Sequence, residues 1–274
     1  MKVTSYPVLI ILLRLRRWVP GAMFAVFILY ADDPSSSRSA EEERRAVLAK
    51  LKTQIPLFNK LRGKHVVLAS GSPRRLEILR TYGLDPVVCP STFPETLSHA
   101  DYEDPAQYAV ATGSAKAVEV YEKLVRDVPD DPPDLVIGAD TVVILGGTNP
   151  AILEKPSSKG DQLDMLESYR GADVRVATGV TLVQPQLATP GYSCTSLVVT
   201  SKVVFAENSP TLLNAYVESG EGIDRAGGFA IQGMGGLLIE RIEGDYNNIV
   251  GFPGQAFFKW LADMTEEGTL LEED

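Results

Sequence analysis

The sequence predicts an α/β fold with a mixed central sheet. Short runs rich in valine, isoleucine and leucine alternate along the chain with longer runs whose apolar residues recur at helical spacing. Such alternation is typical of a sheet that helices cover. Of the 274 residues, 45% are hydrophobic and 23% are charged, as in an ordinary globular protein with one large core or two modest ones.

The first strand and the first helix flank a serine-rich turn. Residues 65–69 form an apolar, β-branched run that suits a buried strand. Ser72 fits the N-cap and Pro73 the first turn of a helix over residues 73–82. Gly83 fits the end of that helix.

The alternation continues to the C-terminus, with breaks at clusters of proline and aspartate. A long buried strand is expected over residues 135–145, interrupted at Asp140 because a carboxylate falls inside an apolar run. Further strands are predicted over residues 86–89, 174–183, 196–205 and 237–242. Further helices are predicted over residues 104–127, 159–169, 211–218 and 253–262.

The turn between the first strand and the first helix is a candidate anion site. The free N–H groups and the positive end of the helix dipole are expected beside Ser70 and Ser72. Arg74 and Arg75 can donate charge-assisted, bidentate hydrogen bonds to a phosphate. The alternatives are an ordinary surface turn and a Ser-Pro phosphorylation site on a mobile segment.

Asp140 is the second candidate. A carboxylate inside an apolar strand is costly to bury without hydrogen bonds, a metal ion or a catalytic role. The alternative is an ordinary polar break at the end of a strand.

Several function classes are disfavoured. The sequence has 2 histidines, too few for a histidine-rich zinc site, and it contains neither a P-loop nor a dinucleotide-binding fingerprint. The net charge of −10 argues against a sequence-independent nucleic-acid binder, so we expect no nucleic-acid partner. Cys89 and Cys194 show no metal spacing and are expected as buried or partly buried free thiols. A reducing, cytoplasmic location fits them.

Residues 1–60 read as an N-terminal extension or targeting segment, and residues 61–274 as the main folded domain. The first 30 residues contain no acid, and their two apolar runs are too short to span a bilayer, so no stable membrane span is expected. A signal-anchor-like stretch and organelle targeting are the alternatives. Residues 32–39 are a polar linker by composition, and residues 40–51 are expected as a charged helix.

A series of motifs carries a family resemblance. They are 68–75 (LASGSPRR), 136–143 (VIGADTVV), 152–156 (ILEKP), 224–233 (DRAGGFAIQG), 244–246 (GDY) and 250–253 (VGFP). In this order and at this spacing they resemble the Maf family of nucleoside triphosphate pyrophosphatases, including the Maf-like domain of acetylserotonin methyltransferase-like proteins. The resemblance implies a fold like that of Maf and inosine triphosphatase enzymes, with two lobes around a cleft. It also implies hydrolysis of a nucleoside triphosphate to the monophosphate and pyrophosphate.

The resemblance also assigns catalytic residues. It makes Asp140 the proton acceptor and a ligand of Mg²⁺ or Mn²⁺, and it brings Glu95 near that metal. Lys116 and Lys155 would stabilise charge on the triphosphate. Without the resemblance, Glu95 reads as an exposed loop residue and Lys116 as a solvated helix lysine.

Substrate choice is implied in the same way. The positions of Arg74, Thr141 and Gln232 match residues that select the substrate, and Gln232 in its motif resembles the branch that acts on dTTP and UTP. Lys202 departs from the family pattern, which usually has an acid there. A non-catalytic nucleotide-binding module linked to cell-division control is the alternative function, and a homodimer is left open.

Overall fold

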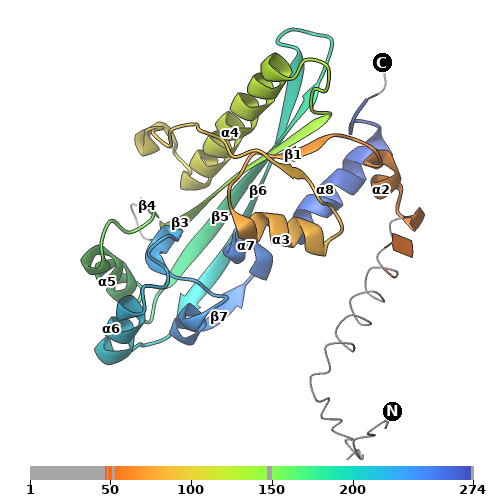
Figure 1. The fold of residues 1–274 in the computed structure, drawn as a ribbon. Helices are drawn as coiled ribbons and strands as arrows, with labels where there is room; N and C mark the ends of the chain where they lie inside the picture. Colours follow the sequence, from red (N-terminus) through yellow and green to blue (C-terminus); the bar gives the residue numbers. More distant parts are fainter. Residues whose placement is uncertain (1–46, 48, 51–52, 147–149, 273–274) are drawn as a thin grey trace, which may run out of the picture. The chain divides into compact units, whose positions relative to one another are not determined.

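Seven strands form one mixed sheet within residues 47, 49–50, 53–146 and 150–272, the part of the chain that the computed structural model describes (Figure 1). The order is β2-β1-β3-β5-β6-β7, and β4 pairs with β3 beside this path. β1 is parallel to β2 and β3, and the other pairs are antiparallel. The bounds are β1 Val66–Leu68, β2 Val87–Val88, β3 Leu135–Leu145, β4 Ala151–Leu153, β5 Asp173–Pro185, β6 Tyr192–Phe205 and β7 Ile239–Glu243. The predicted mixed α/β fold is confirmed.

Within the described chain, the predicted helices begin within one residue of the observed ones, but the last of them continues to Glu267, five residues beyond its predicted end. The bounds are α2 Pro56–Lys60, α3 Pro73–Thr81, α4 Pro105–Asp127, α5 Lys159–Ser168, α6 Pro210–Glu218, α7 Tyr246–Val250 and α8 Gly254–Glu267. The carboxylate of Asp104 caps α4 by accepting from the N–H of Ala106 at 3.1 Å. Ser72 holds the N-cap position of α3, but its side chain makes no capping hydrogen bond. Short 3₁₀ turns lie at His99–Asp101, Ala226–Gly228 and Met234–Leu238.

The predicted interruption of the long strand is wrong. β3 runs unbroken from Leu135 to Leu145, and Asp140 lies opposite Gly179 of β5 in the ladder. The backbone of Asp140 stays in the ladder because β5 pairs along the whole strand, whereas its side-chain charge is compensated by Lys116.

Short elements account for most other differences. Three elements, α2, β4 and α7, have no counterpart among the predicted elements, and each has five residues or fewer. The strand expected from residue 237 begins at Ile239, because Leu237 and Leu238 belong to a 3₁₀ turn. Such short segments carry too few residues for a periodic pattern.

The apolar core divides into parts that correspond to the two expected lobes. On one face of the sheet, Leu79 of α3 and Phe257 of α8 lie in one cluster, while Leu166 of α5 and Leu213 of α6 lie in another. Figure 1 shows these helix pairs toward opposite ends of the long strands. Helix α4 covers the opposite face, where Val120 packs into the core.

Alternation along β3 assigns its side chains to the two faces. Val136, Val142 and Ile144 pack in the clusters beneath α4, whereas Ile137 and Val143 pack in the clusters of the two lobes. Because successive side chains point to opposite faces of a sheet, neighbouring polar residues of β3 meet different helices.

Glycines let α4 lie unusually close to the sheet. A Cβ added to Gly179 of β5 would lie 2.4 Å from the backbone N of Val110. A Cβ added to Gly138 of β3 would lie 2.3 Å from the carbonyl oxygen of Gly113. Both obstacles are backbone atoms of α4, so they cannot rotate away. The glycines therefore set the distance at which α4 side chains reach β3.

We expect Gly179→Ala to lower the free energy of unfolding by about 1–3 kcal/mol, because the added methyl overpacks this contact. Urea titration followed by circular dichroism measures it. Gly160→Ala is the matched control, since the nearest atom to its added Cβ lies at 3.7 Å and the residue belongs to helix α5. Equal stability of the two variants would show that α4 has room to shift.

Several predictions concern residues outside the described ranges. The targeting segment, the polar linker and nearly all of the charged helix over 40–51 fall there. Within the described chain, Leu57 of α2 and Leu61 are buried in the cluster that contains Leu79 of α3 and Phe257 of α8. Helix α2 therefore packs with the predicted main folded domain. None of the helices in this part of the chain has the length and apolar character that a membrane span requires. Both cysteines are free, but the expectation of burial is wrong for Cys194, which is exposed on β6.

Candidate active site

A cavity of about 550 Å³ lies where one edge of β3 lacks a neighbouring strand. β1 pairs with β3 as far as Ile137, and β4 pairs with it from Val143 onward. Residues 138–142 therefore have a strand partner only on the β5 side within the described chain. Side chains from both faces of β3 reach this open edge, which is why Asp140 and Thr141 line the same cavity.

Every residue that the sequence analysis named as a candidate lines this one cavity. They are Ser70, Ser72, Arg74, Arg75, Glu95, Lys116, Asp140, Thr141, Lys155 and Gln232. The candidates come from the turn before α3 and the first turn of α3, the segment after β2, α4, β3, the segment after β4 and the glycine-rich segment before β7. The fold thus brings together residues that are far apart in the chain.

Lys116 joins two carboxylates. Its Nζ lies 2.8 Å from Oδ1 of Asp140 and 2.6 Å from Oε1 of Glu95. The side chains of Lys116 and Asp140 are only 11% and 12% exposed, so this charge pair is shielded from water. Burial raises the pKa of Glu95, but the hydrogen bond and charge of Lys116, with Lys155 and Arg75, outweigh burial and lower it overall. Glu95 is therefore ionised at neutral pH.

The donor set of this pair fits a small divalent cation. Glu95 and Asp140 offer carboxylate oxygens, which Mg²⁺ and Mn²⁺ prefer. No group of three or more histidine, cysteine or acidic side chains suited to a metal occurs in the described residues. Mg²⁺ usually takes one or two protein carboxylates, with water and substrate phosphate completing the shell, so two carboxylates are sufficient.

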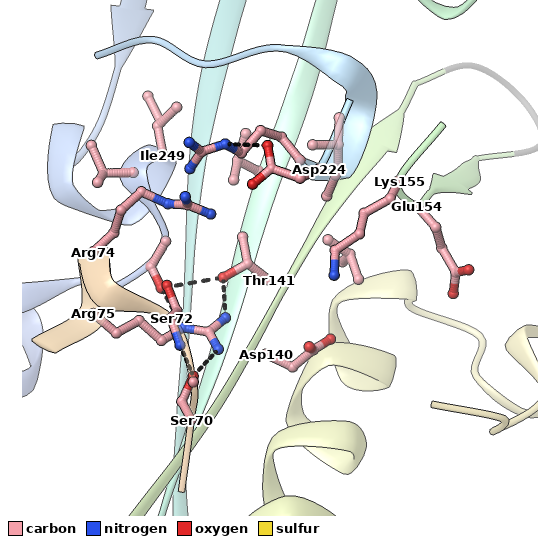
Figure 2. A pocket seen from close by; sticks show the side chains of 18 of the residues that line it. Ser70, Ser72, Arg74, Arg75, Asp140, Thr141, Glu154, Lys155, Asp224 and Ile249 are labelled. Carbon is pink, nitrogen blue, oxygen red and sulfur yellow. Dashed lines mark hydrogen bonds and ion pairs between the residues drawn. The ribbon is translucent and has the colours of Figure 1, made fainter. Parts of the chain in front are cut away.

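Arg75 and Thr141 are joined to each other and to neighbouring residues by hydrogen bonds on the other face of β3 (Figure 2). Arg75 donates from Nε to the carbonyl of Gly251 at 3.0 Å, from Nη1 to Oγ of Ser70 at 3.0 Å and from Nη2 to Oγ1 of Thr141 at 3.1 Å. Oγ1 of Thr141 also contacts Oγ1 of Thr178 at 3.0 Å. Burial is the main cause that lowers the pKa of Arg75, and Asp140 opposes it. Much of the hydrogen-bonding capacity of both residues is therefore used inside the protein.

Lys155 and Arg74 are differently placed. In the described part of the chain, neither has a hydrogen bond or a carboxylate within ion-pair distance. Figure 2 shows the ammonium of Lys155 extending toward Asp140, and the guanidinium of Arg74 extending from α3 toward Asp224. Burial lowers the pKa of Arg74, and the charge of Asp224 opposes this shift. These two cations remain available to a ligand.

The glycine-rich segment needs its two central glycines. Gly227 and Gly228 have φ of 71° and 73°, in the left-handed region that favours glycine. A Cβ on Gly227 would also lie 2.8 Å from Cγ2 of Val143. Tyr169 donates a short hydrogen bond to the carbonyl of Gly227. This turn holds the segment against β3, and Gln232 follows it at the cavity.

Comparison with known proteins identifies the family. A family model described as "Maf-like protein" matches residues 65–264. The chain belongs to the Maf family. A dTTP/UTP pyrophosphatase of Schizosaccharomyces pombe is 40% identical over 218 residues, which cover 77% of this chain and 88% of that protein. A dTTP/UTP pyrophosphatase of Deinococcus radiodurans is 41% identical over 189 residues, covering 69% and 87%.

A human Maf relative has a longer chain. The human protein named "Probable bifunctional dTTP/UTP pyrophosphatase/methyltransferase protein" is 45% identical over 215 residues. The match covers 76% of this chain and 33% of the human protein. The likeness is therefore to one part of that protein.

The Maf cavity also contains residues to which the sequence analysis gave no role. Tyr108, Glu154, Asp224 and Arg225 line it. Glu154 and Asp224 stand inside recognised motifs, next to Lys155 and before the paired glycines, and that proximity was the available signal. Tyr108 carried no signal beyond its position on α4.

Lys202, which departs from the family pattern, lies away from the Maf site. Lys202 pairs in β6 with Arg175 of β5 and Glu243 of β7, and its Nζ lies 3.4 Å from Oδ1 of Asp173. It is not among the residues that line the cavity. The acid that balances Lys202 is thus supplied by the neighbouring strand.

Proposed function

We propose that this Maf protein hydrolyses dTTP and UTP to the nucleoside monophosphate and pyrophosphate, with the help of Mg²⁺ or Mn²⁺. The observation that carries the proposal is the convergence of all ten candidate residues on one cavity that contains two paired carboxylates and two uncommitted cations. The names of the relatives support the choice of substrates.

The triphosphate is assigned to the end of the cavity near β3. Lys155 is uncommitted there, and the start of α3 offers N–H groups because Ser72 makes no capping bond. Arg75 adds a positive charge, but its fixed hydrogen bonds make it a support for the Ser70 turn as well. We assign to Thr141 the task of anchoring Arg75 instead of contacting the base.

The carboxylates are assigned to catalysis. Asp140 and Glu95 would hold the divalent cation, which would supply charge neutralisation at the phosphate and lower the pKa of the attacking water. Asp140 accepts the proton of that water. Lys116 holds the two carboxylates together and offsets their mutual repulsion.

The base is assigned to the part of the cavity where Arg74 extends toward Asp224 (Figure 2), and Gln232, which also lines the cavity, is assigned to it as well. The edge of uracil or thymine presents a carbonyl, an N–H and a second carbonyl. Arg74 can only donate, Asp224 can only accept, and Gln232 can do both. In cytosine the ring nitrogen N3 carries no hydrogen. Its lone pair would therefore face a lone pair of the Asp224 carboxylate, and the two would repel each other.

We therefore expect Asp224→Asn to lower the preference for UTP over CTP by about tenfold, because an amide can donate where the carboxylate only accepts. The ratio of kcat/KM for the two nucleotides measures this preference. Asp263→Asn, an exposed change on α8, is the control. An unchanged ratio in Asp224→Asn would remove this residue from base recognition.

The proposed function is tested by product analysis. The full chain is incubated with dTTP, UTP, dCTP and purine triphosphates in Mg²⁺, in Mn²⁺ and in a chelator. Monophosphate and pyrophosphate from dTTP and UTP, with loss of turnover in the chelator, are the expected result. Diphosphate and inorganic phosphate would mean that a different bond is cut. Binding of nucleotide with no turnover in either metal would favour the regulatory module. The cytoplasmic location, organelle targeting and a homodimer stay predictions.

A further inference from the structure

Glu154 makes contacts for which the proposed chemistry has no use. Its Oε1 lies 3.1 Å from Nε2 of His99 and accepts from the hydroxyl of Tyr108 at 3.3 Å. Figure 2 shows its carboxylate pointing away from Asp140, whereas the neighbouring Lys155 extends toward Asp140. The two side chains thus leave the same stretch of backbone in different directions.

The partners of Glu154 belong to the other segments that frame the site. His99 follows Glu95 by four residues, and Tyr108 lies on α4 two turns before Lys116. The carbonyl of Glu154 accepts from the N–H of Gly227 at 3.0 Å, in the turn before Gln232. The residue next to Lys155 therefore contacts three of the other segments that line the cavity.

Tyr108 is a fixed anchor for these contacts. It is 2% exposed, and its ring packs edge-on against His99 with centroids 4.5 Å apart and against Tyr102 at 5.8 Å. Burial, followed by the charge of Glu154, raises the pKa of Tyr108 to about 12. The hydroxyl therefore keeps its proton at neutral pH and acts as a hydrogen-bond donor to Glu154.

Stability alone does not account for this arrangement. The side chains of His99 and Glu154 are 43% and 54% exposed, and a polar contact between side chains so exposed contributes little to folding. A carboxylate beside a triphosphate site also repels the substrate. A useful role for Glu154 must therefore outweigh that repulsion.

We propose that Glu154 is a positioning residue for Lys155. Held by His99 and Tyr108, its carboxylate fixes the backbone from which the ammonium of Lys155 projects into the cavity. Lys155 has no ion-pair partner of its own in the described chain. Pro156 after it only favours an extended conformation, whereas the contacts of Glu154 tie this stretch of backbone to its neighbours. The inference rests on the proposed function, in which Lys155 binds the triphosphate.

The sign of the effect separates positioning from charge. If Glu154 acted only through its charge, its removal would strengthen nucleotide binding. If it positions Lys155, Glu154→Ala weakens binding by about tenfold, which is the loss of one charge-assisted contact. Glu154→Gln keeps an oxygen that can accept from Tyr108, so we expect it to bind within about threefold of the wild type.

The experiment uses the full chain and two measurements. Calorimetry gives the dissociation constant of UTP with a methylene bridge between its α and β phosphates, and initial rates give kcat and KM for UTP. In Glu154→Ala we expect a higher dissociation constant and a higher KM with little change in kcat. Glu218→Ala, which breaks an exposed ion pair with Lys159 at 2.8 Å, is the matched control.

A double-mutant cycle with Lys155→Ala completes the test. If Glu154 acts through Lys155, adding Glu154→Ala to Lys155→Ala weakens binding no further. Tighter binding in Glu154→Ala, a full additional loss in the double variant, or a lower melting temperature with unchanged binding would each overturn the proposal. A wild type that binds the bridged nucleotide without hydrolysing UTP would overturn the proposed function while the cycle still decides the role of Glu154. A wild type that does not bind it would overturn both.

Discussion

Replacing Asp140 by asparagine is expected to lower kcat for UTP by about two orders of magnitude or more. Asparagine keeps the size of the side chain but cannot accept the proton of an attacking water, and it offers a weaker ligand to a divalent cation. Lys116 keeps Glu95 as a partner at 2.6 Å, so the loss should fall on chemistry and not on folding. Initial rates of pyrophosphate release measure the effect.

Asp85→Asn is the matched control for this experiment. Asp85 is an exposed aspartate that pairs with Arg80 at 2.7 Å, and it does not line the cavity. We expect its rate to equal that of the wild type, and we expect thermal melting of both variants to stay near the wild-type value. Wild-type turnover in Asp140→Asn would remove this carboxylate from the mechanism.

Lys116→Met is expected to lower kcat/KM by about two to three orders of magnitude, which is typical when a preorganised charge-stabilising group is removed from a site. Methionine has a similar length but no charge, so Asp140 and Glu95 would face each other and the triphosphate without a shared cation. Their repulsion would disfavour both the arrangement of the carboxylates and the approach of the substrate.

The same change should also reduce stability, because it leaves Asp140 as a shielded carboxylate without its partner. Rates are therefore measured at a temperature at which circular dichroism shows the variant folded. Arg126→Met on the same helix is the control, since the side chain of Arg126 is 72% exposed and, among the described residues, pairs only with the adjacent Asp127. A folded Lys116→Met protein with near wild-type kcat/KM would show that the carboxylates do not need this cation.

The local sequence pattern was sufficient to predict the long helices and strands. The helix predicted over 104–127 is α4, because its alanine and valine spacing and its Asp104 cap are both local features. The strand predicted over 135–145 is β3, but its interruption at Asp140 was wrong. Whether a polar residue breaks a strand depends on the neighbouring strand, and the pairing of Asp140 with Gly179 is not visible in the local pattern.

The candidate residues could be named for a different reason. Short motifs carried eight of them, Glu95 and Lys116 came from the family resemblance alone, and all ten line one cavity. The motifs did not reveal how each side chain is used. Arg75 bonds to the carbonyl of Gly251, 176 positions later in the chain, and Thr141 is engaged by Arg75. Neither partner follows from the residues around Arg75.

By itself, the sequence determined the alternation of strands and helices, the family and most of the candidate residues, because these depend on side-chain type and spacing within short segments. The tertiary structure alone decided their partners. In the folded chain Asp140 pairs with Lys116 of α4, and Thr141 pairs with Arg75 on the other face of the sheet. Glu154 contacts His99 and Tyr108. The physical reason is that charges and hydrogen bonds are satisfied across space, between segments that only the packing of α4 and the two lobes against the sheet brings together.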